Sequence, residues 1–103
     1  MDYLLFYEYT ADVLERRGPL RADHLARAWE AHSRGEIVLA GALANPVDGA
    51  VFHFRADTPD VVTRFAEADP YVLGGIVTRW YWREWITVVG DAAATPVGRP
   101  GMN

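Results

Sequence analysis

The pattern of hydrophobic and polar positions divides most of the chain into strand-like and helix-like segments. Residues 3–9 (YLLFYEY) are apolar and aromatic with almost no polar interruption, which is typical of a strand covered on both faces. A hairpin is predicted from residues 36–44 (EIVLAGALA) and 50–56 (AVFHFRA), joined by the turn-forming NPVDG at 45–49. A last strand is predicted over residues 78–89 (TRWYWREWITVV).

Two segments have the 3.6-residue period of amphipathic helices. The first runs over residues 20–34, with Gly35 as the expected stop. Its apolar stripe is expected to consist of Leu25, Ala28, Trp29 and His32. The second is expected to begin with Thr58 as the capping residue and Pro59 in the first helical position, and to end by Pro70. Its buried stripe is expected to be Val62, Phe65 and Ala66.

The order strand, helix, strand, strand, helix, strand predicts an α+β fold, a ferredoxin-like βαββαβ sandwich with both helices on one face of the sheet. This domain is expected to span residues 1–90, followed by a flexible C-terminal tail at 91–103. Apolar side chains occupy both faces of the strands, and leaving one face wet would forfeit ~25 cal/mol per Å². We therefore expect a homodimer through the sheet face, with Trp80, Trp82 and Trp85 in the dimer core.

Composition and charge exclude several classes of function. The chain has 103 residues and a net charge of −4, and its ten basic residues are scattered arginines, which gives no footprint for nucleic acid or an anionic membrane. The absence of cysteine excludes a thiol nucleophile and a zinc–thiolate site. We see no basic, apolar-cored leader and no long uncharged apolar run, so a soluble cytoplasmic protein is expected.

The three histidines do not predict a metal site. His24 and His32 would lie ~12 Å apart along a helix, which is too far to share one metal ion. No ligand cluster with zinc spacing occurs elsewhere in the chain. His32 and His53 are expected to be structural, and no cofactor is expected.

His24 and Asp69 are the candidate catalytic pair. His24 is predicted in the first turn of one helix and Asp69 at the close of the other. The two helices of this topology run in opposite directions, so these two ends meet at one end of the sheet. Such a His–carboxylate dyad is suited to proton transfer. The helix dipoles disfavour a charged imidazole at the first end and a carboxylate at the second, and pairing offsets both effects.

A cleft is expected around this pair, formed by the loop at 10–19, the hairpin tip at 45–49 and the segment at 69–78. Its expected lining, and so the candidate substrate-binding residues, are Tyr9, Arg17, Arg21 and Tyr71. Arg21 is the candidate for holding an enolate or phenolate of a small-molecule substrate.

Several short motifs resemble those of the YCII-related (YciI-like) family of the dimeric α+β barrel superfamily. They are ADVLERR at 11–17, Arg21 with His24 and Leu25, the glycine spacing from 35 to 41, and ADPY at 68–71 followed by glycines 74 and 75. The resemblance covers about residues 3–88. It implies a ferredoxin-like homodimer that forms a dimeric α+β barrel, with a site built on His24 and Asp69. It does not imply one reaction, since the superfamily holds lyases, isomerases and cofactor-free monooxygenases.

Three functions therefore remain open. The first is a small cofactor-independent enzyme of lyase or isomerase type, with His24 as general base and Asp69 as the orienting carboxylate. The second is a cofactor-free monooxygenase or cyclase acting on an aromatic or polyketide-like molecule. The third is a non-catalytic dimeric module that binds a small metabolite or supports a partner enzyme. The fold alone does not separate these three functions.

Overall fold

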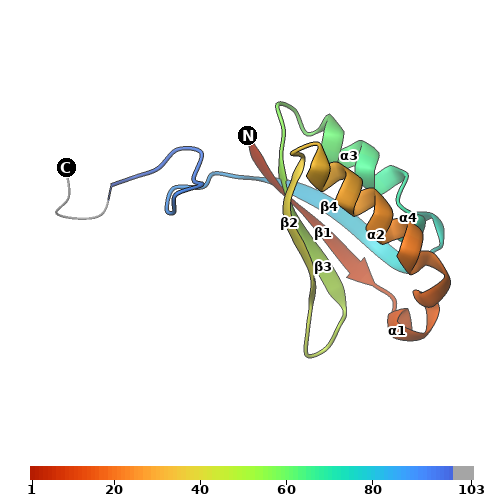
Figure 1. Ribbon diagram of the computed structural model, residues 1–103. Helices are drawn as coiled ribbons and strands as arrows, with labels where there is room; N and C mark the ends of the chain where they lie inside the picture. Colours follow the sequence, from red (N-terminus) through yellow and green to blue (C-terminus); the bar gives the residue numbers. More distant parts are fainter. Residues whose placement is uncertain (99–103) are drawn as a thin grey trace.

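Four antiparallel strands form one sheet in the order β2-β3-β1-β4 in the computed structural model, which describes residues 1–98 (Figure 1). The strands are β1 (Asp2–Tyr9), β2 (Ile37–Leu43), β3 (Gly49–Arg55) and β4 (Val77–Trp85). The helices are α1 (Val13–Arg16), α2 (Gly18–Ser33), α3 (Asp60–Glu67) and α4 (Pro70–Leu73). The two longer helices, α2 and α3, lie on one face of the sheet (Figure 1). The predicted ferredoxin-like α+β fold is confirmed.

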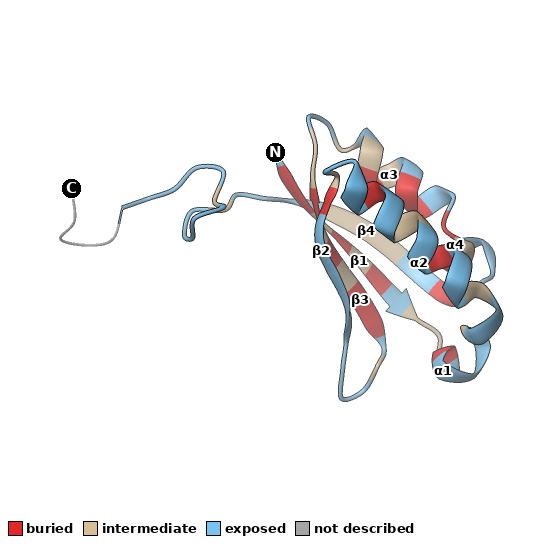
Figure 2. Ribbon diagram, in the orientation of Figure 1, coloured by how far each residue is buried: buried red, intermediate tan, exposed pale blue. Residues whose placement is uncertain are grey.

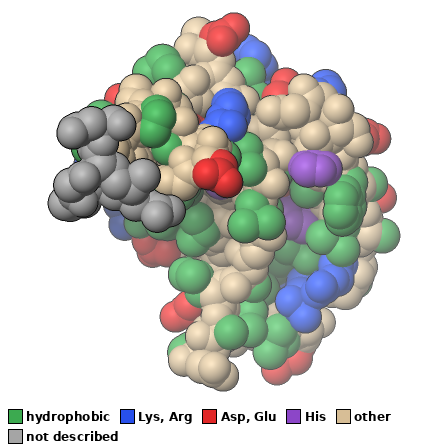
Figure 3. Space-filling model, turned by 60° about the vertical axis from the view of Figure 1, so that its left-hand side comes forward, with side chains coloured by type: hydrophobic (Ala, Val, Ile, Leu, Met, Phe, Trp, Pro, Cys, Tyr) green, Lys and Arg blue, Asp and Glu red, His purple; other side chains and the backbone are tan. Residues whose placement is uncertain are grey.

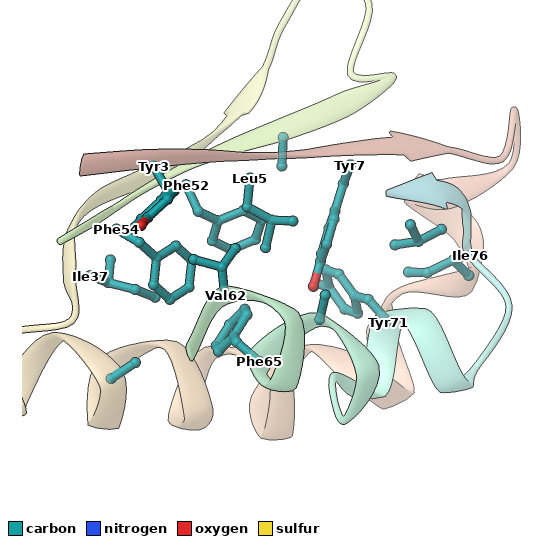
Figure 4. Packing of buried hydrophobic residues seen from close by; sticks show 14 of the residues in the cluster. Tyr3, Leu5, Tyr7, Ile37, Phe52, Phe54, Val62, Phe65, Tyr71 and Ile76 are labelled. Carbon is teal, nitrogen blue, oxygen red and sulfur yellow. The ribbon is translucent and has the colours of Figure 1, made fainter. Parts of the chain in front are cut away.

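The core lies between the sheet and the helices, and alternate residues of β1 point into it. Tyr3, Leu5 and Tyr7 are buried there, because successive strand residues face opposite sides of a sheet. They lie over Val62 and Phe65 of α3 (Figure 4). The predicted buried stripe of this helix is confirmed. Figure 2 shows how burial concentrates on β1, β3 and α3, whereas β2 and most of α2 stay exposed.

The expected position of two tryptophans is wrong. Trp80 pairs with Tyr7 across the β1–β4 ladder and Trp82 pairs with Leu5, so both share the helix side of the sheet with these core residues. Both pack against the core, and the Trp82 ring meets the Tyr3 ring edge-on at 5.6 Å. Both the odd-numbered and the even-numbered residues of these strands are largely apolar. The sequence therefore does not show which of the two sets of residues faces the helices. The outer face has its apolar centre at other residues, namely Leu4, Phe6, Val51 and Tyr81.

The predicted apolar stripe of the first helix is also wrong. The buried residues of α2 are His24 and Ala31, while Trp29 is 66% exposed and Leu25 39% exposed. His32 is exposed as well, although its Nδ1 contacts the backbone oxygen of Ile37 at 2.8 Å. The four predicted residues do share one side of α2, but that side faces an open groove beside β2 rather than the core.

Three element boundaries differ from those expected. Helix α3 begins at Asp60 without a side-chain cap, so Thr58 does not cap it. The last strand ends at Trp85 rather than at residue 89, because Trp85 already pairs with Asp2 at the start of β1. The loop predicted at 10–19 contains α1 and the start of α2.

Beyond β4, residues 86–98 leave the sheet as a segment that folds back on itself, which we call the arm (Figure 1). Its first part is tied to the sheet, because the Thr87 hydroxyl donates to Oδ2 of Asp2 at 3.2 Å. Arg55 donates from Nη2 to the backbone oxygen of Ala92 at 2.7 Å. Of the tail predicted at 91–103, residues 99–103 lie outside the described residues. Within the part that is described, no helix is long and apolar enough to cross a membrane.

Candidate active site

Asp69 is placed by the junction of two helices. The chain leaves α3 at Ala68, and Asp69 is the N-cap of the one-turn helix α4, with Pro70 in its first position. The backbone N–H of Tyr71 donates to Oδ1 of Asp69 at 3.0 Å. The expectation that a helix C-terminus disfavours this carboxylate is therefore wrong. The nearest backbone N–H groups belong to the start of α4, and they favour a negative charge.

The buried carboxylate of Asp69 joins His24 and Tyr7. Its side chain is 0% exposed. Nδ1–H of His24, on the second turn of α2, donates to Oδ1 at 2.8 Å and lies 2.9 Å from Oδ2. The hydroxyl of Tyr7 on β1 donates to Oδ2 at 2.5 Å. Because Nδ1 carries the proton in this bond, Nε2 of a neutral imidazole holds the lone pair.

The His24 ring is held in place by aromatic side chains. It stacks on the Tyr71 ring with centroids 3.8 Å apart and planes 9° apart. The Phe52 ring meets it edge-on at 6.1 Å. Among residues 1–98, Oγ1 of Thr10 is the one side-chain polar atom that is both fully buried and without a hydrogen-bond partner. Nε2 of His24 has no hydrogen-bond partner among these residues either, so it is not fully buried and is accessible to solvent. The imidazole is therefore fixed at one nitrogen and accessible at the other.

A cavity of about 270 Å³ adjoins this imidazole. The four residues expected to line the cleft, Tyr9, Arg17, Arg21 and Tyr71, all line this cavity. Arg21 lies three residues before His24 on α2, which places both on the same face of the helix. The hairpin tip at 45–49 does not line it, contrary to expectation. Residues 40–42 in the middle of β2 form that wall instead.

The tyrosines around the cavity are hydrogen-bonding groups that stay neutral near physiological pH. Burial raises the pKa of Tyr9 to about 12, and the positive charges of Arg17 and Arg21 act against this rise. Burial also raises the pKa of Tyr71, again opposed by the two arginines. Burial, followed by the Asp69 charge, raises the pKa of Tyr7 far above its usual range. The guanidinium groups are therefore close enough to these phenols to influence the cavity.

The contact of Tyr7 with Asp69 was not predicted from the sequence. The available signal was strand parity: Tyr7 and Tyr9 lie two residues apart on the same strand, so both point to the helix side of the sheet. Parity does not tell which hydroxyl finds a buried carboxylate. The hydrogen bond to Asp69 depends on where α4 begins, and that start was not predicted.

The ligand set of the site contains one histidine and one carboxylate. Within residues 1–98, no group of three or more histidine, aspartate and glutamate side chains is arranged to hold a metal ion. The chemistry that the described side chains offer is proton transfer at Nε2 of His24, next to hydrogen-bond donors and two guanidinium groups. Figure 3 shows histidine side chains on this face of the molecule, with hydrophobic side chains and a patch of Lys or Arg side chains close to them.

Comparisons with known proteins concern the family and the fold. The model of the YCII-related domain family matches residues 1–86. Protein YciI of Escherichia coli O6:H1 and that of Shigella flexneri are each 29% identical over 85 residues, which covers 74% of this chain and 87% of the relative. A solved structure of 5-chloro-2-hydroxyhydroquinone dehydrochlorinase (TftG) from Burkholderia phenoliruptrix AC1100, in complex with 2,5-dihydroxybenzoquinone, matches with a TM-score of 0.74. It is 21% identical, and the match covers 84% of this chain and 95% of that one, so the likeness concerns the fold.

Proposed function

The chain belongs to the YCII-related family, and we propose that it is a cofactor-independent enzyme of lyase or isomerase type that takes a proton from a small anionic aromatic substrate. One observation carries this proposal. His24 is bound at Nδ1 by the fully buried Asp69, while its Nε2 is open beside a cavity. A base that is held in one tautomer and aimed at a cavity is what general-base catalysis requires.

The residues have distinct roles in this mechanism. Nε2 of His24 accepts the proton, and Asp69 stabilises the resulting imidazolium and keeps the ring in orientation. Tyr7 and the Tyr71 backbone N–H hold the carboxylate in place. Negative charge develops on the substrate as the proton leaves, and Arg17 and Arg21 at the cavity stabilise it.

The substrate class follows from the size and lining of the cavity. A volume of about 270 Å³ suits a molecule with one aromatic ring and a few polar substituents. Tyr9, Phe52 and Tyr71 offer ring surfaces, and the two arginines select a phenolate, enolate or carboxylate. The structurally similar dehydrochlorinase acts on a chlorinated hydroxyhydroquinone, which has these properties.

The test uses the compounds named for that relative. We expect the chain to bind 2,5-dihydroxybenzoquinone saturably in calorimetry and to release chloride from 5-chloro-2-hydroxyhydroquinone or a related halophenol. His24→Asn keeps an N–H for Asp69 but has no basic nitrogen. It should keep binding and lose turnover by at least ~100-fold.

Each other outcome has a defined meaning. Turnover that persists in His24→Asn shows that another group is the base. Binding without any turnover by the wild-type chain supports the non-catalytic binding module. Oxygen consumption that accompanies turnover supports the monooxygenase. An absence of binding across a panel of anionic phenols shows that the proposed substrate class is wrong.

A further inference from the structure

An apolar groove runs beside the active site, between α2 and the outermost strand β2. It has a volume of about 290 Å³, and we call it the α2–β2 groove. One wall carries Leu25, Trp29 and His32 of α2, and the other carries Val38 and Leu39 of β2. Trp29 is 66% exposed and Leu39 is 74% exposed. Large apolar side chains gathered this way mark a surface that binds another apolar group.

The strand that borders the groove is an edge without the usual protection. Strand β2 pairs with β3 on one side, and within residues 1–98 its other side has no partner strand. Its sequence, IVLAGAL, contains no charge and no proline, and all its residues after Ile37 are exposed. Edge strands of soluble monomers are normally blocked by charges, prolines or covering elements. We therefore expect another segment to cover this edge.

The arm, residues 86–98, presents apolar side chains that its own chain leaves uncovered. Ile86 is 68% exposed, Val89 86% and Val97 65%. The arm has a defined shape, because Thr95 N–H donates to the Thr87 backbone oxygen at 3.1 Å and Val97 N–H donates to that of Val88 at 2.8 Å. The arm also projects away from the sheet and helices (Figure 1). A shaped apolar segment that projects from the body is suited to docking on a second molecule.

We propose that the arm of a second copy of this chain docks in the α2–β2 groove, and that the exchange is reciprocal. Consider two copies joined by their outer sheet faces around a two-fold axis parallel to the strands. This axis places β4 of one copy over β2 of the other, running antiparallel to it, at the ~10 Å spacing of packed sheets. The outer face has the apolar centre that such packing needs, including Phe6 stacked on Tyr81 at 5.0 Å.

The register then brings each arm to a groove. Strand β4 ends at Trp85, which pairs with Asp2, and Asp2 pairs on its other side with Arg55. Strand β2 begins at Ile37, which pairs with Phe54 next to Arg55. The end of β4 and the start of β2 therefore lie at the same end of the sheet. The partner's arm emerges at this same end, where the α2–β2 groove begins. The arm folds back on itself, and its outgoing half, residues 86–90, reaches ~16 Å when extended, more than the ~10 Å spacing of the sheets.

Docking of the arm would also complete the active site. Leu25, Ala28 and Ala40 line both the α2–β2 groove and the cavity beside His24. An arm in the groove covers the open β2 side of that cavity and excludes water from it. The proposal does not rest on the proposed function, because it follows from the groove, the arm and the register alone.

Cysteine cross-linking tests the contact directly, since the chain contains no cysteine. One chain carries Val89→Cys in the arm, and a second, isotopically labelled chain carries Leu39→Cys in the groove. A short bis-maleimide should join the two into a mixed product with twice the chain mass of 11.5 kDa, identified by its label. The control replaces the groove variant with Leu73→Cys, which is 73% exposed on α4 and outside the groove. Equal yields from the two pairs, or no product from the first, would overturn the proposal.

Sedimentation equilibrium provides the second readout. The wild-type chain should dimerise at micromolar concentration. Val89→Asp should raise the dimer Kd at least about tenfold, because it places a carboxylate in an apolar groove. Leu73→Asp, a matched exposed substitution, should leave Kd unchanged. A wild-type chain that stays monomeric, or a Val89→Asp dimer as tight as the wild type, contradicts docking of the arm.

Discussion

The molecule contains two buried His–carboxylate pairs of nearly equal geometry. His24 Nδ1 lies 2.8 Å from Asp69 Oδ1, and His53 Nε2 lies 2.6 Å from Asp2 Oδ1. Both carboxylates are 0% exposed. The first pair lies on the helix side of the sheet beside the active-site cavity. The second lies at the end of the outer sheet face and lines neither of the two cavities described above.

The neighbours of the two pairs differ in charge. Asp2 also accepts a bond from Nε of Arg55 at 3.0 Å and one from the Thr87 hydroxyl at 3.2 Å. A permanent cation therefore compensates Asp2 whether or not His53 is protonated. Asp69 accepts its other bonds from the neutral hydroxyl of Tyr7 and the backbone N–H of Tyr71. Of the described side chains that are hydrogen-bonded to Asp69, the imidazole is the one that can gain a positive charge.

This difference shows why a short His–Asp distance does not define a catalytic pair. A carboxylate that is already neutralised by arginine has little left to gain when the imidazole takes up a proton. The second pair instead anchors the arm, because Thr87 and Arg55 both connect Asp2 to residues 86–98. We therefore assign proton transfer to the first pair and a structural role to the second.

The largest expected effect comes from removing each imidazole in turn. His24→Asn should lower turnover at least ~100-fold, because the general base is lost. His53→Asn should leave turnover within about threefold of wild type. His53 does not line the cavity, and only groups that contact the transition state alter the rate of the chemical step. Chloride release from a halophenol measures both. Equal losses of turnover in the two variants would show that proton transfer is not specific to the His24–Asp69 pair.

The two carboxylates should also differ in the pH dependence of stability that they confer. Burial alone would raise the pKa of the Asp2 carboxyl, but hydrogen bonds from His53, Arg55 and Thr87 outweigh it and hold the pKa below the usual range. A lowered folded-state pKa contributes stability above the unfolded value of ~3.9 and loses it as the pH falls through the folded value. Asp2→Asn should therefore reduce the free energy of unfolding by ~1–3 kcal/mol at neutral pH.

Urea unfolding at several pH values measures this contribution. The difference between the wild type and Asp2→Asn should shrink as the pH drops below ~4, and it should go on shrinking as the pH falls through the folded-state pKa of Asp2. Asp57→Asn, at an exposed position, serves as the control and should track the wild type throughout. A difference that is independent of pH would mean that Asp2 acts by packing rather than by charge.

A smaller effect is expected from removing the Tyr7 hydroxyl, which binds Asp69, compared with removing the Tyr3 hydroxyl, which does not. Tyr7→Phe removes the 2.5 Å bond to Asp69 and should lower kcat by up to about tenfold and stability by ~1 kcal/mol. Tyr3→Phe is the matched control on the same strand and face, since the Tyr3 hydroxyl contacts only Met1 Sδ at 3.6 Å among the described residues. It should change both values by less than half as much. Equal losses of kcat and stability in both variants would show that the Tyr7 hydroxyl has no specific role in the active site.

The fold and the central dyad were predictable from the sequence because both depend on the order of elements. Opposed helices bring His24 and Asp69 together whatever the exact helix ends are. The missed features depend on local events with weak sequence signals. Pro70 predicts the end of one helix, but it also occupies the first position of α4, and that start makes Asp69 a cap. Trp29 follows a regular helical stripe, yet it is exposed because its own chain leaves the β2 side open.

The smallest expected effect concerns Tyr9, and it sharpens the contrast in hydroxyl groups between the two pairs. The active-site pair has Tyr7, Tyr9 and Tyr71 nearby, whereas no tyrosine within residues 1–98 is hydrogen-bonded to the second pair. Burial raises the pKa of Tyr9 to about 12, so its phenol stays neutral through neutral and mildly basic solution and does not repel an anionic ligand. Tyr9→Phe should therefore leave the pH profile of 2,5-dihydroxybenzoquinone binding unchanged from pH ~7 to ~10 and alter Kd by less than about threefold. Calorimetry of both proteins across this range is the measurement. A basic limb present in the wild type and absent from Tyr9→Phe would show that Tyr9 ionises there, and that the cavity is more hydrated than the burial of its tyrosines indicates.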